Sequence, residues 1–337
     1  MARPVRIGLV LIIEALMFGA FIAGLLIRDA IPFAVLVAAC IAGVLGIRAG
    51  LKRLGVAEAG SLLHEERRVA LAGLVVCLAL FPILLTAVFH QPYWIYVITV
   101  AGIYVCLSLG LNIVVGLAGL LDLGYIAFYA IGAYLSALVS LNTDHWWAMW
   151  LMVPVCMAVS AFFGMMLGAP TLRLRGDYLA IVTLGFGEII RIVLNNWNSV
   201  TNGPIGLPNI PYPRIFGFDF GLGVNVAGIH FGYESVFYVM VVSLAFVIAG
   251  VARRLDDSRV GRAWRAIRED ELAAGAMGIN TRNLKLLAFA SGASFAGVSG
   301  LVFAHMSTFI EPSSFMFMES AFILCMVVLG GMGSIPG

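Results

Sequence analysis

The sequence predicts an all-α polytopic membrane protein with about ten transmembrane helices. Hydrophobic residues make up 62% of the 337 residues and charged residues only 11%, whereas a soluble domain is typically ~25% charged. The apolar residues also gather in long runs, such as 69–89 and 148–169, close to the ~20 residues that a helix needs to cross a bilayer. These observations exclude a soluble enzyme, a secreted disulfide scaffold and a disordered chain.

Ten apolar runs follow one another along the chain and are interpreted as spans. The first follows Arg3 and Arg6, as the apolar core of a signal peptide would. It is too long for a cleaved signal, and a second apolar run follows at once, so a retained span is favoured. The predicted spans are 7–27, 31–47, 69–89, 93–115, 121–141, 148–170, 178–194, 234–252, 284–305 and 315–330.

Positive charges gather on one side of this topology. With a cytoplasmic N-terminus, 17 of the 20 Lys and Arg residues fall in or at the edge of the inner segments. The positive-inside rule therefore predicts this orientation, with the N-terminus in the cytoplasm. The inner segments are 1–6, 48–68, 171–177 and 253–283, with Lys285 at the edge of the last.

The run 178–194 is a short span that carries two charges, Glu188 and Arg191. Without it, the basic loops 171–177 and 253–283 would lie on opposite sides, so the charge bias favours a segment that crosses or enters deeply. A charge at mid-bilayer costs at least ~2.5 kcal/mol and usually faces a bundle interior or a water-filled cavity.

On a helix, the polar residues of this run gather along one stripe, with Glu188 three residues before Arg191. The stripe is a candidate lining of a translocation path or gate; alternatively, an internal ion pair holds helices together. The residues at intervals of four are Thr183, Gly187, Arg191 and Asn195.

Asp122 follows a glycine-interrupted apolar stretch, Gly116-Leu-Ala-Gly-Leu-Leu. Such interruptions indicate discontinuous helices around a transport site. Asp122 is therefore a second candidate for the translocation path. Alternatively, Asp122 is the N-cap residue of the helix that runs through Ser140. Glu319 is interpreted as structural. Gly292, Ala296 and Gly300 form a small-residue ridge that predicts close helix packing.

Two loops are long enough to carry a function. The outer loop 195–233 contains four prolines and many glycines, which predicts an irregular segment, either a docking surface or a plain connection. The inner loop 253–283 lacks proline over 261–278 and mixes apolar residues with charges. This pattern predicts short amphipathic helices beneath the membrane, with Trp264, Ile267, Leu272 and Met277 as their apolar residues.

No catalytic or cofactor-binding motif is found. The sequence lacks GxxxxGK[ST], HExxH and GxSxG, and its histidines and cysteines are scattered. We therefore predict no catalytic residue, metal or cofactor in this chain. The net charge of +2 gives no indication of a nucleic-acid partner.

Several segments together resemble a known family. Arg173-Leu-Arg-Gly-Asp-Tyr through Gly187-Glu-Ile-Ile-Arg191, followed by Thr201-Asn-Gly-Pro-Ile-Gly206, is similar to the signature of LivM-type permeases, the membrane subunits of ABC importers for branched-chain amino acids. Further resemblances lie at 116–134, 261–278 and 329–334. The resemblance covers 93–337, with 1–92 as an N-terminal extension of about three spans.

The resemblance implies an ABC importer permease architecture of the LivHM and ribose-permease type. The loop 253–283 would couple to an ATPase through an EAA-like pattern formed by Glu271, Ala273, Ala274 and Gly278. The implied partners are membrane lipid, a second, LivH-like permease, two LivG- and LivF-like ATPases that hydrolyse ATP, and a periplasmic substrate-binding protein that delivers substrate.

The function expected from these observations is import of leucine, isoleucine or valine. Two alternatives stay open: the same transporter type for urea, short amides or other amino acids, and an ion-coupled secondary transporter that uses Glu188 and Asp122. A polytopic membrane enzyme or scaffold is a further class, which the basic loop disfavours. The chain ends at Gly337, directly after the predicted span 315–330. We therefore also expect it to lack the last spans of its relatives.

Overall fold

The computed structural model describes residues 92–143, 145, 147–171, 177–215, 218–226 and 229–335. The chain divides into two compact units, Met1–Ile95 and Tyr96–Gly337. The spans expected at 7–27, 31–47 and 69–89 lie outside the described residues.

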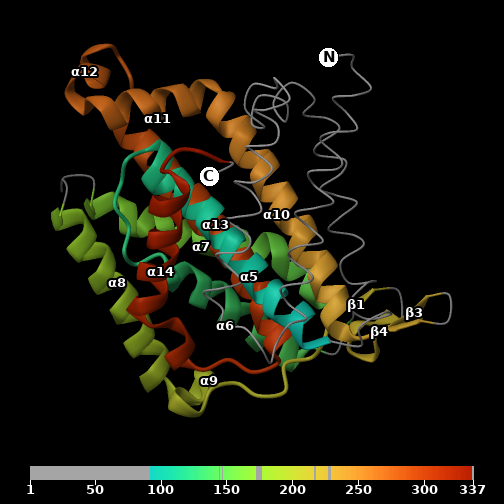
Figure 1. Ribbon diagram of the computed structural model, residues 1–337. Coiled ribbons are helices and arrows are strands. Elements are labelled where there is room, and N and C mark those ends of the chain that lie inside the picture. The colour runs from blue at the N-terminus through green and yellow to red at the C-terminus, as the bar shows by residue number, and fades with distance from the viewer. Residues whose placement is uncertain are drawn as a thin grey trace, which may run out of the picture. The chain divides into compact units, whose positions relative to one another are not determined.

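Each of the seven spans expected between 93 and 330 coincides with a helix (Figure 1). The first helix continues into a π-helical turn, and the predicted bounds differ from the observed ones by a few residues. The helices are α5 (Pro92–Leu111) with its continuation η2 (Asn112–Leu117), α6 (Ile126–Asn142), α7 (Ala148–Thr171), α8 (Asp177–Asn196), α10 (Tyr233–Asp257), α13 (Thr281–Ser307) and α14 (Phe317–Gly330).

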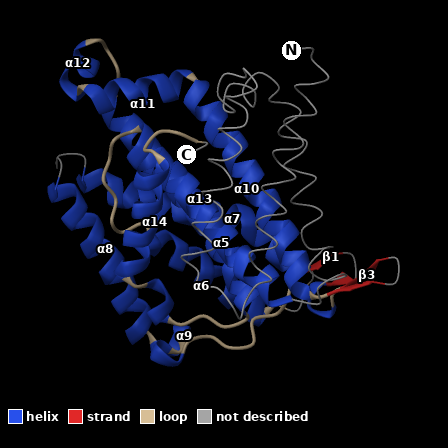
Figure 2. Cartoon of the chain, in the orientation of Figure 1, coloured by secondary structure: helices blue, strands red, loops and turns tan. Residues whose placement is uncertain are grey.

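The connections contain shorter elements (Figure 2). Their short helices and turns are α9 (Asn198–Thr201), α11 (Arg259–Glu269), α12 (Glu271–Ala276), η3 (Gly203–Ile205), η4 (Phe220–Leu222) and η5 (Pro312–Phe315). Two antiparallel hairpins pair β1 (Arg214–Ile215) with β2 (Phe218–Asp219) and β3 (Val224–Val226) with β4 (Ile229–Phe231). The described part of the outer loop 195–233 is thus made of turns, short helices and two hairpins, and the prediction of an irregular segment did not include the hairpins.

Five segments of the described chain are long and apolar enough to cross a bilayer. They are Tyr93–Leu117, Ala148–Thr171, Tyr178–Asn196, Tyr233–Asp257 and Thr281–Ser307. The apolar helices α6 and α14 are shorter, with 17 and 14 residues, or roughly 25 and 21 Å at 1.5 Å per residue. The described part of the chain is therefore predominantly α-helical, and its long apolar helices indicate a multi-pass membrane protein.

Helix α13 forms the core of the unit, between α6 and α7. Its backbone lies directly against theirs: a Cβ added to Gly300 would lie 2.1 Å from the Tyr129 carbonyl oxygen, and one on Gly132 would lie 2.0 Å from that of Gly297. Only glycine permits such approach, so the packing predicted from the Gly292–Gly300 ridge is confirmed.

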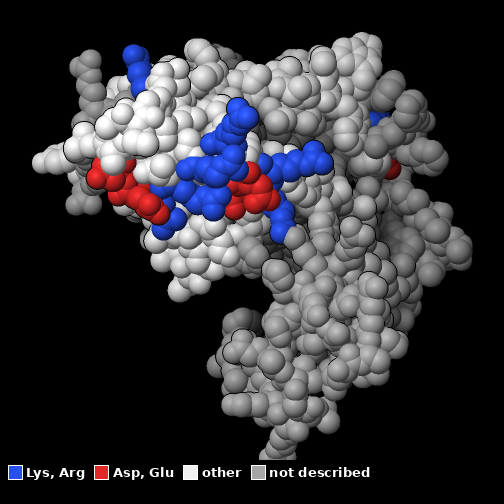
Figure 3. Space-filling model, turned by 90° about the horizontal axis from the view of Figure 1, so that it is seen from above, with Lys and Arg blue, Asp and Glu red and all other residues white. Residues whose placement is uncertain are grey.

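Charged residues gather at one end of the helices. Helices α11 and α12 lie at one end, and α9 with the hairpins lies at the other (Figure 1). Viewed onto the first end, Lys and Arg side chains gather beside Asp and Glu, and most of the other described residues in this view are uncharged (Figure 3). We call this end, which carries 253–285, the charged end.

Candidate functional site

Two capped helices build the segment 258–280 at the charged end, which we call the docking segment after the ATPase-coupling role expected for it. Ser258 begins α11, where its hydroxyl oxygen accepts hydrogen bonds from the backbone N–H groups of Val260 and Gly261. Asp270 ends α11 and begins α12, and its carboxylate accepts from the N–H groups of Leu272 and Ala273. These caps satisfy orphan donors at each helix start, so the sequence fixes a break between two short helices.

One face of α11 holds the docking segment against the membrane helices. Gly261, Trp264 and Ile267 are buried on it, at the spacing of neighbouring turns. The Trp264 indole N–H donates to the carbonyl oxygen of Leu284 at 2.8 Å, at the start of α13. The prediction that Trp264 and Ile267 form the apolar face is confirmed.

Glu271, the first residue of the EAA-like pattern, pairs with Lys285 of α13. Their Oε1 and Nζ atoms are 2.6 Å apart, with Lys285 only 7% exposed and Glu271 30% exposed. Removing one partner of a buried ion pair leaves an uncompensated charge that costs ~3–5 kcal/mol. The pair therefore fixes α12 to the start of α13.

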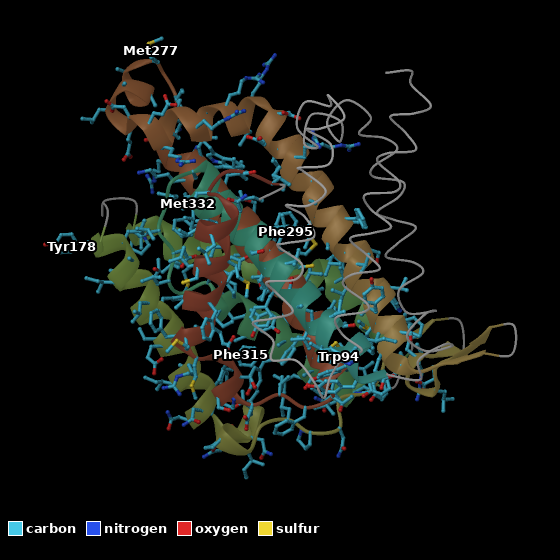
Figure 4. All side chains as sticks on the ribbon, viewed as in Figure 1. Trp94, Tyr178, Met277, Phe295, Phe315 and Met332 are labelled. Atoms are coloured by element: carbon cyan, nitrogen blue, oxygen red, sulfur yellow. The ribbon has the colours of Figure 1, made fainter. Side chains whose placement is uncertain are left out.

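Apart from Glu271 and Ala274, the residues of α12 and the following residue Met277 are exposed. Leu272 is 70% exposed and Met277 is 83% exposed, and Met277 points away from the helices (Figure 4). Our expectation of an apolar face turned beneath the membrane is wrong for these two residues, because Ala274 is the residue of α12 that packs inward. Ala273 is also exposed, and Gly278 ends the turn with φ +85°.

Arg268 connects the docking segment to the first described membrane helix. Its guanidinium donates to the carbonyl oxygen of Gly116 in η2. Asn112 of the same turn donates to the Ser334 carbonyl oxygen at 3.0 Å and accepts from the Gly333 N–H at 2.8 Å. Three segments that are far apart in the sequence thus meet where η2 ends.

Directly after η2 the chain leaves the helical conformation until α6 begins at Ile126. Asp122 lies in this break, residues 118–125, and is fully buried; its carboxylate accepts from the Gly124 N–H at 2.9 Å. The interruption that the glycines predict is confirmed. The alternative that Asp122 is the N-cap is wrong, because Tyr125 is the N-cap residue of α6 and the Asp122 carboxylate binds the Gly124 N–H, which lies before the helix.

The break packs against α8 and brings two predicted residues together. The Thr183 hydroxyl accepts from the N–H of Leu123 at 3.0 Å, and Thr183 is fully buried. A Cβ on Gly124 would lie 2.0 Å from the Thr183 carbonyl oxygen. Asp122 and Thr183 are thus neighbours although 61 positions separate them.

Gly187, also predicted, lies against the break too, since a Cβ on it would be 3.2 Å from the Cα of Gly124. The remaining predicted residues of α8 lie apart from that contact. Glu188 and Arg191 form the i,i+3 ion pair expected from their spacing, with side chains 38% and 31% exposed. Asn195 is half-buried near the opposite end of the helix, roughly 18 Å along the axis from Thr183 at 1.5 Å per residue. The stripe is therefore not one continuous buried lining.

One acidic residue that we interpreted as structural has a polar partner inside the membrane region. The Tyr104 hydroxyl of α5 donates to Oε2 of Glu319 on α14. Next to it, the Ser320 hydroxyl accepts from the N–H of Ile126 at 3.0 Å. A charge inside an apolar span is costly enough to indicate function, and this signal in 315–330 was available from the sequence.

Comparison with known proteins shows the family to which this chain belongs. Residues 93–337 match the profile described as "Branched-chain amino acid transport system / permease component". The chain belongs to this family. The match covers α5 to α14, including the break and the docking segment, whereas no solved structure matches the chain.

Two similar proteins are both named as permease proteins of a branched-chain amino acid transport system. The high-affinity branched-chain amino acid transport system permease protein LivM of Escherichia coli is 48% identical over 248 residues, which are 70% of this chain and 58% of LivM. LivH of Salmonella typhimurium, from a transport system of the same name, is 28% identical over 71% of this chain and 78% of its own length. The chain thus spans about 58% of the LivM protein it resembles.

Proposed function

We propose that this chain is a permease subunit of an ATP-driven ABC importer that moves leucine, isoleucine and valine inward across the bacterial inner membrane. Family membership and the 48% identity to LivM support this proposal. The observation that carries it is the docking segment, which presents exposed Leu272 and Met277 at the charged end.

We propose that α12 inserts into a groove on an ATPase subunit. Two exposed apolar residues on a short helix, surrounded by charge, have the composition of an interface core with a polar rim. The docking segment is also held in place at the start of α13, by the hydrogen bond of Trp264 and the ion pair of Glu271. A pre-ordered segment binds a partner with a smaller entropic cost than a free loop.

This assignment also orients the protein. ATP is hydrolysed in the cytoplasm, so the charged end would face inward, in agreement with the positive-inside rule. The N-terminus would then be cytoplasmic, with about ten spans, of which three belong to an extension over 1–92. The opposite end, with the loop 195–233, would receive substrate from a periplasmic binding protein.

A second permease subunit would complete the path. Because the family includes both LivM and LivH relatives, we propose a LivM-like chain paired with a LivH-like one. The apolar surface of α8, where Ile181 and Ile189 are 63% and 59% exposed, is available for that subunit or for lipid.

The proposal is tested by co-purification and by substrate competition. The tagged chain, co-expressed with its importer subunits, is expected to retain two ATPases and a second permease in mild detergent. Vesicles of the assembled complex should take up labelled leucine, with competition by isoleucine and valine and none by urea or acetamide. Competition by urea or acetamide, with none by isoleucine or valine, would contradict the substrate assignment.

A further inference from the structure

A cavity of about 230 Å³ lies between four membrane helices. Helix α5 contributes Ile103 and Leu107, α6 contributes Ile126 and Tyr129, and α13 contributes Phe303. The three aliphatic side chains are at most 3% exposed, and the Tyr129 and Phe303 rings lie 5.4 Å apart. For comparison, an apolar cavity of ~150 Å³ is large enough for benzene.

One edge of this cavity is polar. Tyr104 faces it from α5, Ser314 from η5 and Glu319 from α14. Glu319 is the one charged group among the described residues that line it, and the hydrogen bond from the Tyr104 hydroxyl occupies its carboxylate. The cavity therefore joins an acidic group and the hydroxyl groups of Tyr104 and Ser314 to an interior of aliphatic and aromatic side chains, among them the ring of Tyr129.

We propose that this cavity binds the transported amino acid as a zwitterion with a branched aliphatic side chain, an inference that rests on the transport function proposed above. The ammonium group pairs with the Glu319 carboxylate. The Tyr104 hydroxyl is then released to donate to the substrate carboxylate, as does the hydroxyl of Ser314. The side chain lies among Ile103, Leu107 and the aromatic rings.

The position of the cavity suits a step in translocation. Ile126 is both a lining residue and the first residue of α6, directly after the break that holds Asp122. Its N–H is bonded to Ser320, next to Glu319. A shift of the break relative to α14 would therefore change the shape of the cavity. Broken helices commonly border the binding sites of transporters.

Direct binding to the purified full chain in lipid nanodiscs tests the proposal. Saturable binding of labelled leucine is expected, with competition by 3-methylbutylamine, which keeps the ammonium group. The deaminated analogue 4-methylpentanoate should compete at least roughly tenfold more weakly, because a hydrogen-bonded charge is worth ~1.5–3 kcal/mol. Absence of saturable leucine binding, or stronger competition by 4-methylpentanoate, would overturn the proposal.

Variants separate binding from folding. Glu319→Gln should weaken leucine binding roughly ten- to hundredfold, and Leu107→Trp should abolish it by filling the cavity. The matched control is Val105→Trp, because Val105 lies on the same helix but is 49% exposed and outside the cavity. Melting temperatures identify variants that fail to fold. Wild-type affinity in folded Glu319→Gln and Leu107→Trp would overturn the proposal.

Uptake by the assembled importer separates this inference from the proposed function. ATP-dependent leucine uptake that is unchanged in Glu319→Gln and Leu107→Trp would refute the cavity and leave the importer role intact. Leucine binding that depends on Glu319, together with vesicles that show no ATP-dependent uptake, would support the cavity and refute the importer role.

Discussion

The guanidinium of Arg268 donates a hydrogen bond to the carbonyl oxygen of Gly116, 152 positions earlier in the chain. This bond joins the end of α11 to the end of η2, directly before the break that holds Asp122. A movement of the docking segment would therefore be transmitted to the break through the side chain of Arg268. Coupling between the two segments is established by a variant whose effects on docking and on transport are both measured.

Arg268→Ala should uncouple docking from transport. The variant loses a charge-assisted hydrogen bond worth ~1.5–3 kcal/mol, so leucine uptake by the assembled importer should fall about tenfold or more. Co-purification of the ATPases should persist, because Leu272 and Met277 are unchanged. The matched control is Arg262→Ala, whose guanidinium bonds within the charged end to the Asp257 carbonyl oxygen. Wild-type uptake in Arg268→Ala would contradict this role.

Glu271→Lys should destabilise the docking segment. It places a second positive charge beside Lys285, which is nearly buried, and breaking such a pair costs ~3–5 kcal/mol. ATPase co-purification should be lost, and the exchange Glu271→Lys with Lys285→Glu should restore part of it. The control Glu269→Lys changes a neighbouring exposed acid. Equal loss in that control would show that general surface charge, and not this pair, is responsible.

Leu272→Asp combined with Met277→Asp should abolish ATPase binding without unfolding the chain. Both side chains are exposed in the isolated subunit, and exposed substitutions usually change stability by no more than ~0.5 kcal/mol. Central apolar contacts of an interface are often worth at least ~2 kcal/mol each. The measurement is co-purification alongside a melting curve. Retained ATPase in the double variant would place the docking surface elsewhere.

Gly124→Ala should destabilise the contact between the break and α8. The added Cβ would lie 2.0 Å from the Thr183 carbonyl oxygen, and overpacking typically costs ~1–3 kcal/mol. The matched control is Gly185→Ala on α8, where a Cβ would meet no atom within 4 Å. Thermal unfolding in detergent should show a melting temperature lowered by several degrees only for Gly124→Ala. Equal melting temperatures for the two variants would contradict this packing.

Glu188→Ala should lower leucine uptake if the ion pair lines the path or a gate. The substitution leaves Arg191 without its partner on a helix that lies in the membrane, which is costly unless water reaches it. Uptake is compared at matched expression, with Arg191→Ala and the double variant completing a cycle. Unaltered uptake in Glu188→Ala would assign the pair a purely structural role.

Local patterns predicted much of this fold. Apolar run length located the seven helices between 93 and 330 because bilayer thickness sets helix length. The i,i+3 spacing predicted the Glu188–Arg191 pair, and helical periodicity predicted the buried face with Trp264 and Ile267. Each of these depends on residues within one or two helical turns of one another.

The contacts between segments could not be predicted in the same way. Nothing in the local sequence indicates that Arg268 bonds to Gly116, that Thr183 meets the break, or that Lys285 partners Glu271, because these contacts arise from tertiary packing. Leu272 and Met277 resemble buried residues by composition, and only the three-dimensional structure shows that they face outward. The partner of Glu319 could not be predicted for the same reason, because Tyr104, which donates a hydrogen bond to it, lies 215 positions earlier in the chain.

Leucine uptake into proteoliposomes containing the assembled complex decides whether this chain works in an ATP-driven importer. ATP supplied on the side of the charged end, with binding protein on the other side, should drive accumulation that persists when an ionophore abolishes the proton gradient. Accumulation that proceeds without ATP and disappears with the proton gradient would contradict this role and indicate an ion-coupled transporter.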